Sequence, residues 1–198
     1  MIVAGLTGSI AMGKSETARM FRAAGVPVFD ADTTVHGLYA KGGAAVAPVG
    51  ARFPEVITGG AVDRAKLAER ILNDELAMAE LEAIVHPLVW AEEKEFLNGQ
   101  RAVNAPLVII DNPLLFESGR YRAVDTVIVV SAPEDVQRQR ALQRPGMTLE
   151  KFNAILARQL PDHEKRARAD FVIDSAKGLE HANRQVLAII AKLQERHA

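Results

Sequence analysis

No cysteine occurs among the 198 residues, and neither sign of charge predominates, because 24 lysines and arginines stand against 25 aspartates and glutamates. The absence of cysteine excludes a disulfide framework, a zinc site built on thiolates and a cysteine nucleophile. A protein that binds nucleic acid in bulk normally carries a basic excess, whereas the net charge here is −1. We therefore expect no nucleic-acid partner, and phosphate binding only at a local site.

The sequence also lacks a run of about 18 apolar residues. Its first residues, Met-Ile-Val-Ala-Gly-Leu-Thr, contain neither a basic region nor a small-residue cleavage site. We therefore expect a cytoplasmic protein with no membrane partner. Hydrophobic residues account for 48% and charged residues for 25%, the usual balance of a globular protein. The length suits one domain with an inserted subdomain, and we expect a monomer or a weak oligomer.

Short apolar runs alternate with longer helical patterns along the chain. Continuously apolar runs, such as Leu-Val-Ile-Ile at 107–110, are typical of parallel strands that are covered on both faces. The alternation is that of βαβ units, and it predicts an α/β fold with a five-stranded parallel sheet and helices on both faces. The five predicted strands lie at 2–7, 26–29, 107–111, 126–131 and 171–174.

Two stretches between these strands are too long for a single crossover helix. Residues 30–106 are helical over 63–97 and predict an inserted helical subdomain, while residues 133–170 are helical, carry eight lysines and arginines, and predict a mobile lid. We expect one domain over 1–198. Its predicted parts are a core over about 1–32, 104–135 and 169–198, a subdomain over about 33–103 and a lid over about 136–168.

Residues 8–15, Gly-Ser-Ile-Ala-Met-Gly-Lys-Ser, match the phosphate-loop pattern G-x-x-x-x-G-K-[ST] between a predicted strand and a predicted helix. In such a loop, backbone N–H groups surround the β-phosphate and the amino end of the next helix faces the anion. Lys14 then bridges the β- and γ-phosphates, and Ser15 offers a hydroxyl to Mg²⁺. The pattern predicts a P-loop NTPase fold that uses ATP and Mg²⁺, with a glycine-containing turn and a surface lysine as the alternative. The predicted phosphate-binding residues are Gly8, Ala11, Met12, Gly13, Lys14, Ser15 and Glu16.

Two missing motifs restrict the class of P-loop protein. No Asn-Lys pair occurs in the chain, so the guanine-reading motif of a GTPase is absent. The strand that ends at Asp111 continues into Asn112 and Pro113, where a motor-type ATPase normally has a glutamate that activates water. Asp111 can hold the metal ion through water. The sequence therefore favours phosphoryl transfer to an alcohol over hydrolysis.

Two aspartates, Asp30 and Asp32, follow the second predicted strand. Ligands of open α/β sheets bind beyond the carboxyl ends of the strands, so both residues are expected at the crevice of the phosphate loop. One of these carboxylates can accept a proton from a hydroxyl group. The alternative for either residue is an N-cap of the helix that starts near Thr33.

Several segments occur in the order and spacing of one family. They are Gly-Leu-Thr-Gly at 5–8, Asp-Ala-Asp at 30–32, Val-His at 35–36, His-Pro-Leu-Val at 86–89, Asp111 with Pro-Leu-Leu-Phe-Glu at 113–117, and Gln-Arg at 143–144 with Thr148. Together they resemble the dephospho-CoA kinase family along nearly the whole chain. The resemblance implies ATP-dependent phosphorylation of the 3′-hydroxyl of the dephospho-CoA ribose, the last step of CoA biosynthesis. It also implies a nucleotide core, a helical CoA subdomain and a lid.

The same resemblance implies roles for further residues. The implied catalytic residues are Lys14, Asp32, Arg140 and Arg144, and the implied substrate contacts are Asp32, His86, Leu114, Leu115 and Glu117. The two arginines lie one helical turn apart, where lid closure would bring them to the phosphates. Structural roles are the alternatives: His86 and Pro87 can end a helix, an apolar run such as 114–116 is more often core, and Glu117 needs a partner or water. Residues 174–178 resemble the loop that lies against adenine.

Three residues depart from the family pattern, namely Ala11, Glu16 and Asn112. Ala11 replaces a usual glycine and is costly if its φ is positive. Glu16 brings a negative charge near the polyphosphate, although the first turn of a helix favours it. Asn112 replaces a usual apolar residue, and either weakens a buried strand end or gains a polar contact.

The residues leave two other functions open. One is a P-loop kinase for another small metabolite, such as a nucleoside monophosphate or shikimate. The other is a regulatory protein that binds ATP without catalysis.

Overall fold

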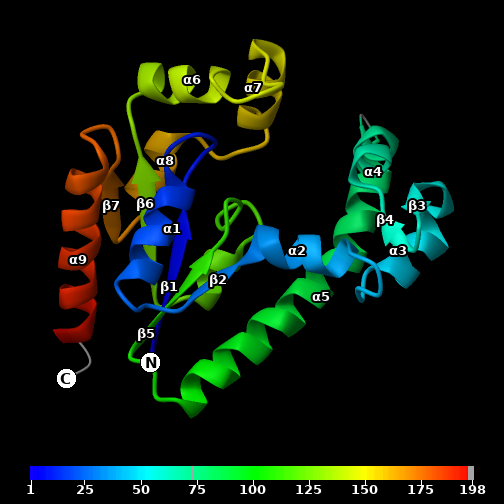
Figure 1. Ribbon diagram of the computed structural model, residues 1–198. Coiled ribbons are helices and arrows are strands. Elements are labelled where there is room, and N and C mark those ends of the chain that lie inside the picture. The colour runs from blue at the N-terminus through cyan, green and yellow to red at the C-terminus, as the bar shows by residue number, and fades with distance from the viewer. Residues whose placement is uncertain (73, 196–198) are drawn as a thin grey trace. The chain divides into compact units, whose positions relative to one another are not determined.

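The computed structural model describes residues 1–72 and 74–195 of the chain (Figure 1). It divides into two compact units, the first made of residues 1–29 and 100–198 and the second of residues 30–99. None of the helices in the described residues is long and apolar enough to span a membrane.

The first unit is built on a five-stranded sheet whose order is β2-β5-β1-β6-β7. β1 pairs in parallel with β5 and with β6, and β6 pairs in parallel with β7. The predicted α/β fold with a five-stranded parallel sheet is thereby confirmed. The strands are β1 (Ile2–Thr7), β2 (Val28–Asp30), β5 (Leu107–Asp111), β6 (Thr126–Ser131) and β7 (Phe171–Asp174).

Helices cover both faces of this sheet. On one face, α1 (Lys14–Ala23) and α9 (Leu179–Glu195) contact each other and bury alternate strand residues, among them Leu6, Ile109 and Ile128. On the other face, Val127 and Val129 pack with residues 115–116, and α8 (Asp162–Ala167) lies against β6. The short 3₁₀ helix η2 (Arg120–Ala123) belongs to this second face through Tyr121. Because successive side chains of a strand point to opposite faces of the sheet, one strand contributes residues to the core on both faces.

β1 lies between β5 and β6, and the connections diverge from it. From β1 the chain passes through α1 to β2 on one side, whereas from β6 it continues to β7 on the other side. Ligands of open α/β sheets bind beyond the carboxyl ends of the strands at such a point. The loop over residues 8–13 follows β1 at this position.

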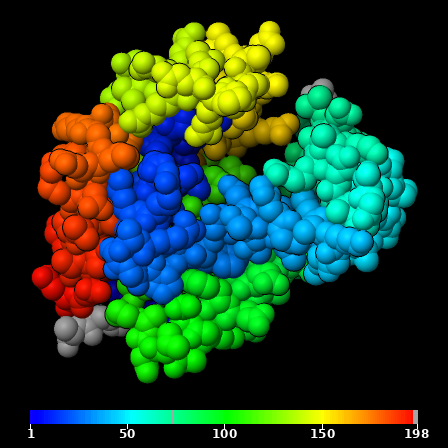
Figure 2. Space-filling model, viewed as in Figure 1, coloured from blue at the N-terminus to red at the C-terminus, as the bar shows by residue number. Residues whose placement is uncertain are grey.

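Two helices from the predicted lid lie against that loop. They are α6 (Glu134–Leu142) and α7 (Leu149–Leu156), which contact each other. Buried Ala141 and Phe152 form an apolar cluster with Ala11, and Ile10 packs against it. In Figure 2 the atoms of these helices, drawn in yellow-green and yellow, lie next to dark blue atoms from the first part of the chain.

The second unit is mostly helical and has its own core. Its elements are α2 (Ala31–Tyr39), α3 (Val46–Arg52), the 3₁₀ helix η1 (Pro54–Val56), β3 (Ile57–Thr58), β4 (Ala61–Val62), α4 (Arg64–Ile71) and α5 (Glu75–Ala102), whose last residues enter the first unit. Phe53 is fully buried at the centre, and the guanidinium carbons of Arg52 and Arg70 lie 5.0 and 5.6 Å from its ring centroid.

Two features of this unit differ from the sequence analysis. β3 and β4 form a small antiparallel hairpin that was not predicted, and its turn is Gly59-Gly60, both with positive φ. Such a pair of glycines is a hairpin signal. The second difference concerns Pro87, which lies inside α5. The alternative that His86 and Pro87 end a helix is therefore wrong.

Candidate active site

Two glycines of the phosphate loop are required by geometry. A Cβ atom at Gly8 would lie 2.6 Å from the carbonyl oxygen of Val130 on β6, so the loop can pass this strand only without a side chain. Gly13 has a φ of 97° and precedes α1 directly. Glycine adopts that left-handed conformation without a steric penalty. The two glycines of the motif thus fix the path of the loop from β1 into α1.

Ala11 also adopts a positive φ, of 62°. A left-handed conformation costs an L-residue about 1–2 kcal/mol relative to glycine. Its methyl group is buried against Ala141 and Phe152, and burial of one methyl group returns about 0.8 kcal/mol. The departure at this position therefore has a cost that packing only partly offsets.

The concave side of the loop presents five open N–H groups. They belong to Ala11, Gly13 and the first helical residues Lys14, Ser15 and Glu16, and none of them has a backbone or side-chain acceptor within residues 1–72 and 74–195. The first N–H groups of a helix have no partner within it. Together with the positive end of the helix dipole, they form a site suited to an anion such as a polyphosphate.

Lys14 and Asp111 form a close ion pair at this site. The Lys14 Nζ atom lies 2.6 Å from Asp111 Oδ1, and the two side chains are 14% and 4% exposed. Ser15 is exposed at the first turn of α1. A hydroxyl and a carboxylate are hard oxygen donors of the kind that Mg²⁺ takes together with substrate phosphates, so these two residues suit the predicted metal ion.

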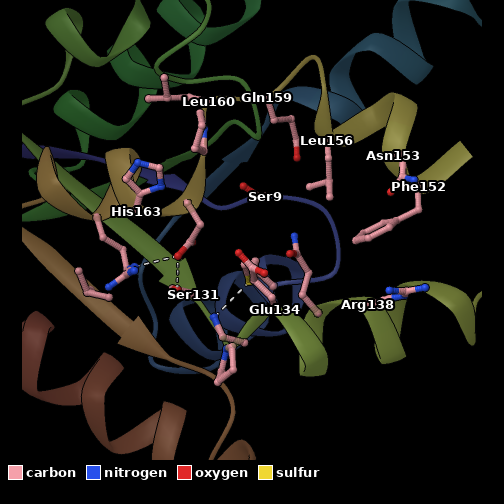
Figure 3. A pocket seen from close by; sticks show the side chains of 18 of the residues that line it. Ser9, Ser131, Glu134, Arg138, Phe152, Asn153, Leu156, Gln159, Leu160 and His163 are labelled. Atoms are coloured by element: carbon pink, nitrogen blue, oxygen red, sulfur yellow. Dashed lines mark hydrogen bonds and ion pairs between the residues drawn. The ribbon is translucent and has the colours of Figure 1, made fainter. Parts of the chain in front are cut away.

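The convex side of the loop is tied down by side chains. Gln137 Nε2 donates to the carbonyl oxygen of Ile10 at 2.9 Å, and the N–H of Ile10 donates to Gln159 Oε1 at 3.0 Å. Ser175 Oγ donates to the carbonyl oxygen of Met12 at 2.7 Å. Gln137 and Gln159 also line a cavity of about 750 Å³ between α6, α7 and α8, and Figure 3 shows Gln159 and Ser9 at its wall.

The two arginines of the predicted lid differ in their contacts. Arg140 donates through its two terminal nitrogens to Ser175, at 2.9 Å to Oγ and at 2.8 Å to the carbonyl oxygen. Arg144 is exposed, and its side chain has no partner within the described residues. The pair was predicted to act together on the phosphates, yet only Arg144 has a guanidinium that is not already engaged.

The other two departures from the family pattern find local partners. Glu16 forms an ion pair with Arg19 on the next turn of α1, so its charge is balanced in part. Asn112 Oδ1 accepts a hydrogen bond from the N–H of Leu114 at 2.9 Å, and the N–H of Asn112 donates to the carbonyl oxygen of Leu6. Asn112 thus gains the polar contact that was one of its two alternatives.

The two aspartates after β2 have different roles in the structure. Asp30 is the N-cap of α2, where its Oδ1 accepts a hydrogen bond from Thr33 at 2.9 Å. Asp32 lies exposed in the first turn of the same helix. The N-cap interpretation therefore holds for Asp30, and Asp32 is left as the candidate for proton transfer.

Some of the predicted substrate residues are exposed, whereas others are already packed against neighbouring side chains. His86 is stacked on Trp90, with ring centroids 5.8 Å apart, and Trp90 is 44% exposed. Leu114 is exposed, whereas Leu115 is fully buried among the residues that cover β6, which favours the core alternative for Leu115. The predicted substrate contact of Leu115 would require this core to open.

Glu117 has the partner that its sequence context demanded. Its Oε1 atom lies 2.8 Å from Nζ of the fully buried Lys165 and accepts a hydrogen bond from the N–H of Leu160 at 2.7 Å. Lys165 Nζ also donates to the carbonyl oxygen of Pro113. A carboxylate that neutralises a buried ammonium is held in place by it. This ion pair fixes the segment after β5 to α8.

The loop over residues 174–178 is held by a hydrogen bond to the side chain of its first residue, Asp174. The N–H of Ala176 donates to Asp174 Oδ1 at 2.8 Å, and this hydrogen bond, with Lys177 nearby, lowers the pKa of Asp174 below its usual value. Gln185 of α9 donates to the carbonyl oxygen of Asp174. The loop is thus fixed to the end of β7 by an ionised carboxylate.

The side-chain contacts of four residues at the site were not predicted from the sequence, namely those of Gln137, Gln159, Ser175 and Lys165. Each contacts a residue more than 40 positions away in the chain, so no local spacing indicates it. One weak signal exists for Gln137, because a polar residue on the helix face between Val136 and Ala141 requires a buried partner.

The order of the strands, the helix that starts at Lys14 and the open N–H groups before and within its first turn define a P-loop protein. The solved structures similar to the chain agree with this class. A shikimate kinase from Acinetobacter baumannii, whose structure contains shikimate, superposes with a TM-score of 0.53 at 17% identity over 99% of this chain and 94% of that one, which shows the shared fold alone.

Closer relatives identify the family. The model of the dephospho-CoA kinase family matches residues 1–181. A dephospho-CoA kinase of Mesorhizobium japonicum is 55% identical over 194 residues, 98% of each chain, and one from Campylobacter jejuni superposes with a TM-score of 0.74 at 26% identity over 99% of this chain and 98% of that one. A protein of Thermus thermophilus superposes with a TM-score of 0.82 at 34% identity over 97% of each chain. The chain belongs to the dephospho-CoA kinase family.

Proposed function

We propose that this chain transfers the γ-phosphoryl group of ATP to the 3′-hydroxyl of the ribose of dephospho-CoA, giving CoA and ADP. The observation that carries the proposal is the set of five open N–H groups beside the Lys14 ammonium. Their number and their place before and at the start of a helix suit the β- and γ-phosphates of a nucleotide. Membership of the dephospho-CoA kinase family supplies the acceptor.

In this proposal the phosphate loop binds and orients the nucleotide. The N–H groups between Ala11 and Glu16 surround the β-phosphate, and Lys14 moves its ammonium from Asp111 toward the β- and γ-phosphate oxygens. Arg144 neutralises charge that spreads over the γ-phosphoryl oxygens. Catalysis of phosphoryl transfer rests almost entirely on such positioning and charge stabilisation.

Asp32 accepts the proton in the proposed reaction. As the 3′-oxygen of the acceptor forms its bond to the γ-phosphorus, the bond from that phosphorus to the β–γ bridging oxygen breaks, and ADP leaves. The proton of the 3′-hydroxyl passes to the carboxylate of Asp32, which follows β2 by two residues. The Asp32 carboxylate is exposed in the first turn of α2 and is therefore accessible to the hydroxyl group of an acceptor.

Ser15 and Asp111 would hold Mg²⁺, with Asp111 acting through water. The ion would supply positive charge that offsets the negative charge of the phosphate oxygens during transfer. In the same proposal, residues 33–103 form the CoA subdomain and residues 136–168 a lid, with His86, Leu114 and Glu117 at the acceptor. The protein acts in the cytoplasm as a monomer or weak oligomer, without a nucleic-acid or membrane partner.

A coupled assay of ADP release tests the proposed activity. The purified chain is given ATP, Mg²⁺ and one acceptor at a time: dephospho-CoA, a nucleoside monophosphate, shikimate or none. We expect release that depends on dephospho-CoA, with 3′-phosphorylation confirmed by mass spectrometry of the product. Release with another acceptor alone would identify a different metabolite kinase, and ATP binding without any release would identify a regulatory protein.

Hydrogen exchange tests the division of labour between the parts. With dephospho-CoA alone we expect protection within residues 63–97, and with ATP alone protection of residues 8–16. Protection of 63–97 by ATP alone would contradict a subdomain dedicated to the acceptor.

A further inference from the structure

The phosphate loop has two sides with opposite hydrogen-bonding character. On the concave side, the N–H groups of Ala11 and Gly13 have no acceptor within the described residues. On the convex side, the carbonyl oxygens of the residues just before them, Ile10 and Met12, each accept a hydrogen bond from a side chain. These donors come from α6 and from the loop after β7, far from residues 8–13 in the sequence.

The planarity of the peptide bond connects the two sides. In a trans peptide unit, the C=O of one residue and the N–H of the next point in opposite directions. When Gln137 holds the carbonyl of Ile10 outward, the N–H of Ala11 must point inward. In the same way, the hydrogen bond from Ser175 to the carbonyl of Met12 directs the N–H of Gly13 inward. The orientation of two anion-binding donors is therefore set by two side chains that do not face the anion.

Rotation of either peptide unit would put a carbonyl oxygen where a phosphate oxygen belongs. The Ile10–Ala11 unit is the more vulnerable, because such a rotation returns φ of Ala11 from 62° to the negative range that an alanine prefers. The second hydrogen bond on Ile10, from its N–H to Gln159, holds the preceding peptide unit as well. The loop thus resists a rotation that its own sequence favours.

Arg140 is connected to this arrangement through Ser175. Its guanidinium donates to both the hydroxyl and the carbonyl of Ser175, so it fixes the side chain that holds Met12. Gln137 and Ser175 are buried, 4% and 8% exposed, which excludes competing water from these hydrogen bonds. A planar guanidinium that uses two nitrogens on one residue has a defined orientation.

We propose that Gln137 and Ser175 are positioning residues that direct the N–H groups of Ala11 and Gly13 toward the phosphates, and that Arg140 acts through Ser175 rather than on the phosphates. These three residues are called the carbonyl clamp below. The inference rests on the proposed function, because it assumes that the loop binds a polyphosphate. It adds to that function the means by which the predicted lid segment controls the geometry of the loop.

Calorimetry with inorganic tripolyphosphate measures the affinity of the phosphate loop for the phosphates alone, without the adenosine part of ATP. We expect Gln137→Leu and Ser175→Ala each to weaken tripolyphosphate and ATP by the same factor, on the order of fivefold to tenfold, which is the usual effect of one net hydrogen bond. Affinity for dephospho-CoA should stay unchanged. The matched controls are Gln139→Leu on the exposed face of α6, and Ser118→Ala, which removes a hydroxyl that donates to the carbonyl of Leu114.

A double-mutant cycle separates a role through Ser175 from direct contact. If Arg140 acts through Ser175, then Arg140→Met weakens tripolyphosphate in the wild-type background and adds less than twofold in the Ser175→Ala background. If Arg140 contacts the phosphates, the two losses multiply, and this part of the proposal is overturned. An equal loss of dephospho-CoA affinity in Gln137→Leu or Ser175→Ala would also overturn it, since that pattern indicates general destabilisation.

The other possible results also decide between the carbonyl clamp and the proposed function. If Gln137→Leu does not fold, Ser175→Ala decides alone, because it removes a single hydroxyl group. Wild-type protein that binds neither tripolyphosphate nor ATP would contradict the proposed function itself. Wild-type protein that binds both, with affinities unchanged in Gln137→Leu and Ser175→Ala, would overturn only the carbonyl clamp.

Discussion

The region around the phosphate loop and the helical unit over residues 30–99 use their polar side chains in different ways. Around the loop, Lys14 is paired with a buried aspartate, and Gln137 and Arg140 hold backbone carbonyls or their partners. In the helical unit, Asp32 is exposed. The comparison teaches that function and stability are carried by the same residues in the first region and by different residues in the second.

The ion pairs of the helical unit fit this contrast. Arg52 pairs with Glu80, and Arg70 pairs with Asp74, but all four side chains are about a third or more exposed. The hydrogen bond from Arg70 lowers the pKa of Asp74, yet pairs in contact with water contribute little to the free energy of unfolding. This unit is held mainly by its apolar core around Phe53. Single changes of its exposed carboxylates should therefore leave the fold intact.

The largest effect is expected for Lys14→Met. Loss of a cation at the transferred phosphoryl group should lower kcat on the order of a thousandfold. In addition, Asp111 would lose its ammonium partner while only 3% exposed, which should lower the free energy of unfolding by about 3–5 kcal/mol. Steady-state kinetics and denaturant unfolding of the same preparation measure the two effects.

A second variant separates the two losses of Lys14→Met. Adding Asp111→Asn removes the charge that the Lys14 ammonium balances in the wild type, so stability should return toward the wild-type value while turnover stays low. If Lys14→Met is as stable as the wild type, this lysine contributes to function and not to stability. That result would contradict the claim that the same residues carry both around the phosphate loop.

Asp32→Asn should produce the next largest effect, and on activity alone. The change keeps the volume but removes the proton acceptor, which is typically worth about 10²–10⁴-fold in rate. Because Asp32 is exposed, the melting temperature and the affinity for ATP should hardly change. If Asp30→Asn is the damaging change instead, the N-cap is the base and the assignment of the two aspartates is reversed.

Arg144→Lys tests the contrast between the two arginines of α6 and its following turn. Lysine keeps the charge but loses the planar fork that grips two phosphate oxygens. We expect kcat to fall roughly tenfold with little change in KM for ATP, the pattern of an interaction made mainly in the transition state. A change confined to KM would mean that Arg144 binds the ground state only, and no change at all would make it a solvated surface residue.

The sheet could be predicted from the sequence because its strands are continuously apolar runs. The phosphate-loop motif in addition indicates where α1 begins. The short hairpin at 57–62 was missed, since strands of two residues carry no period and only Gly59-Gly60 indicates the turn. At the site, Lys14 and Ser15 follow from the motif alone. The partners of the convex side could not be predicted, because Gln137 and Ser175 meet the loop from 127 and 163 residues away.

Individual roles were hardest to predict where a residue type suits both chemistry and structure. Glu117 and Arg140 are charged residues in segments that resemble a family site, and in the structure Glu117 pairs with Lys165 while Arg140 donates to Ser175. Leu115 belongs to the core over β6. Only burial and distance separate these alternatives, and neither can be read from local spacing.

The smallest expected effect concerns Ala11, compared with Ala141 in the same apolar cluster. Ala141→Gly removes a buried methyl group, worth about 0.8 kcal/mol, and places glycine inside α6 at a further cost of about 1 kcal/mol. Ala11→Gly loses the same methyl group and gains unfolded-state freedom, but it relieves about 1–2 kcal/mol of left-handed strain.

The two glycine variants should therefore differ in denaturant unfolding. We expect Ala141→Gly to lower the free energy of unfolding by about 2 kcal/mol and Ala11→Gly to leave it within about 0.5 kcal/mol of the wild type. The difference measures the strain held in the phosphate loop. An equal loss in both variants would mean that Ala11 carries no strain, and the loop would then need no side chains on its convex side to resist rotation of the Ile10–Ala11 peptide unit.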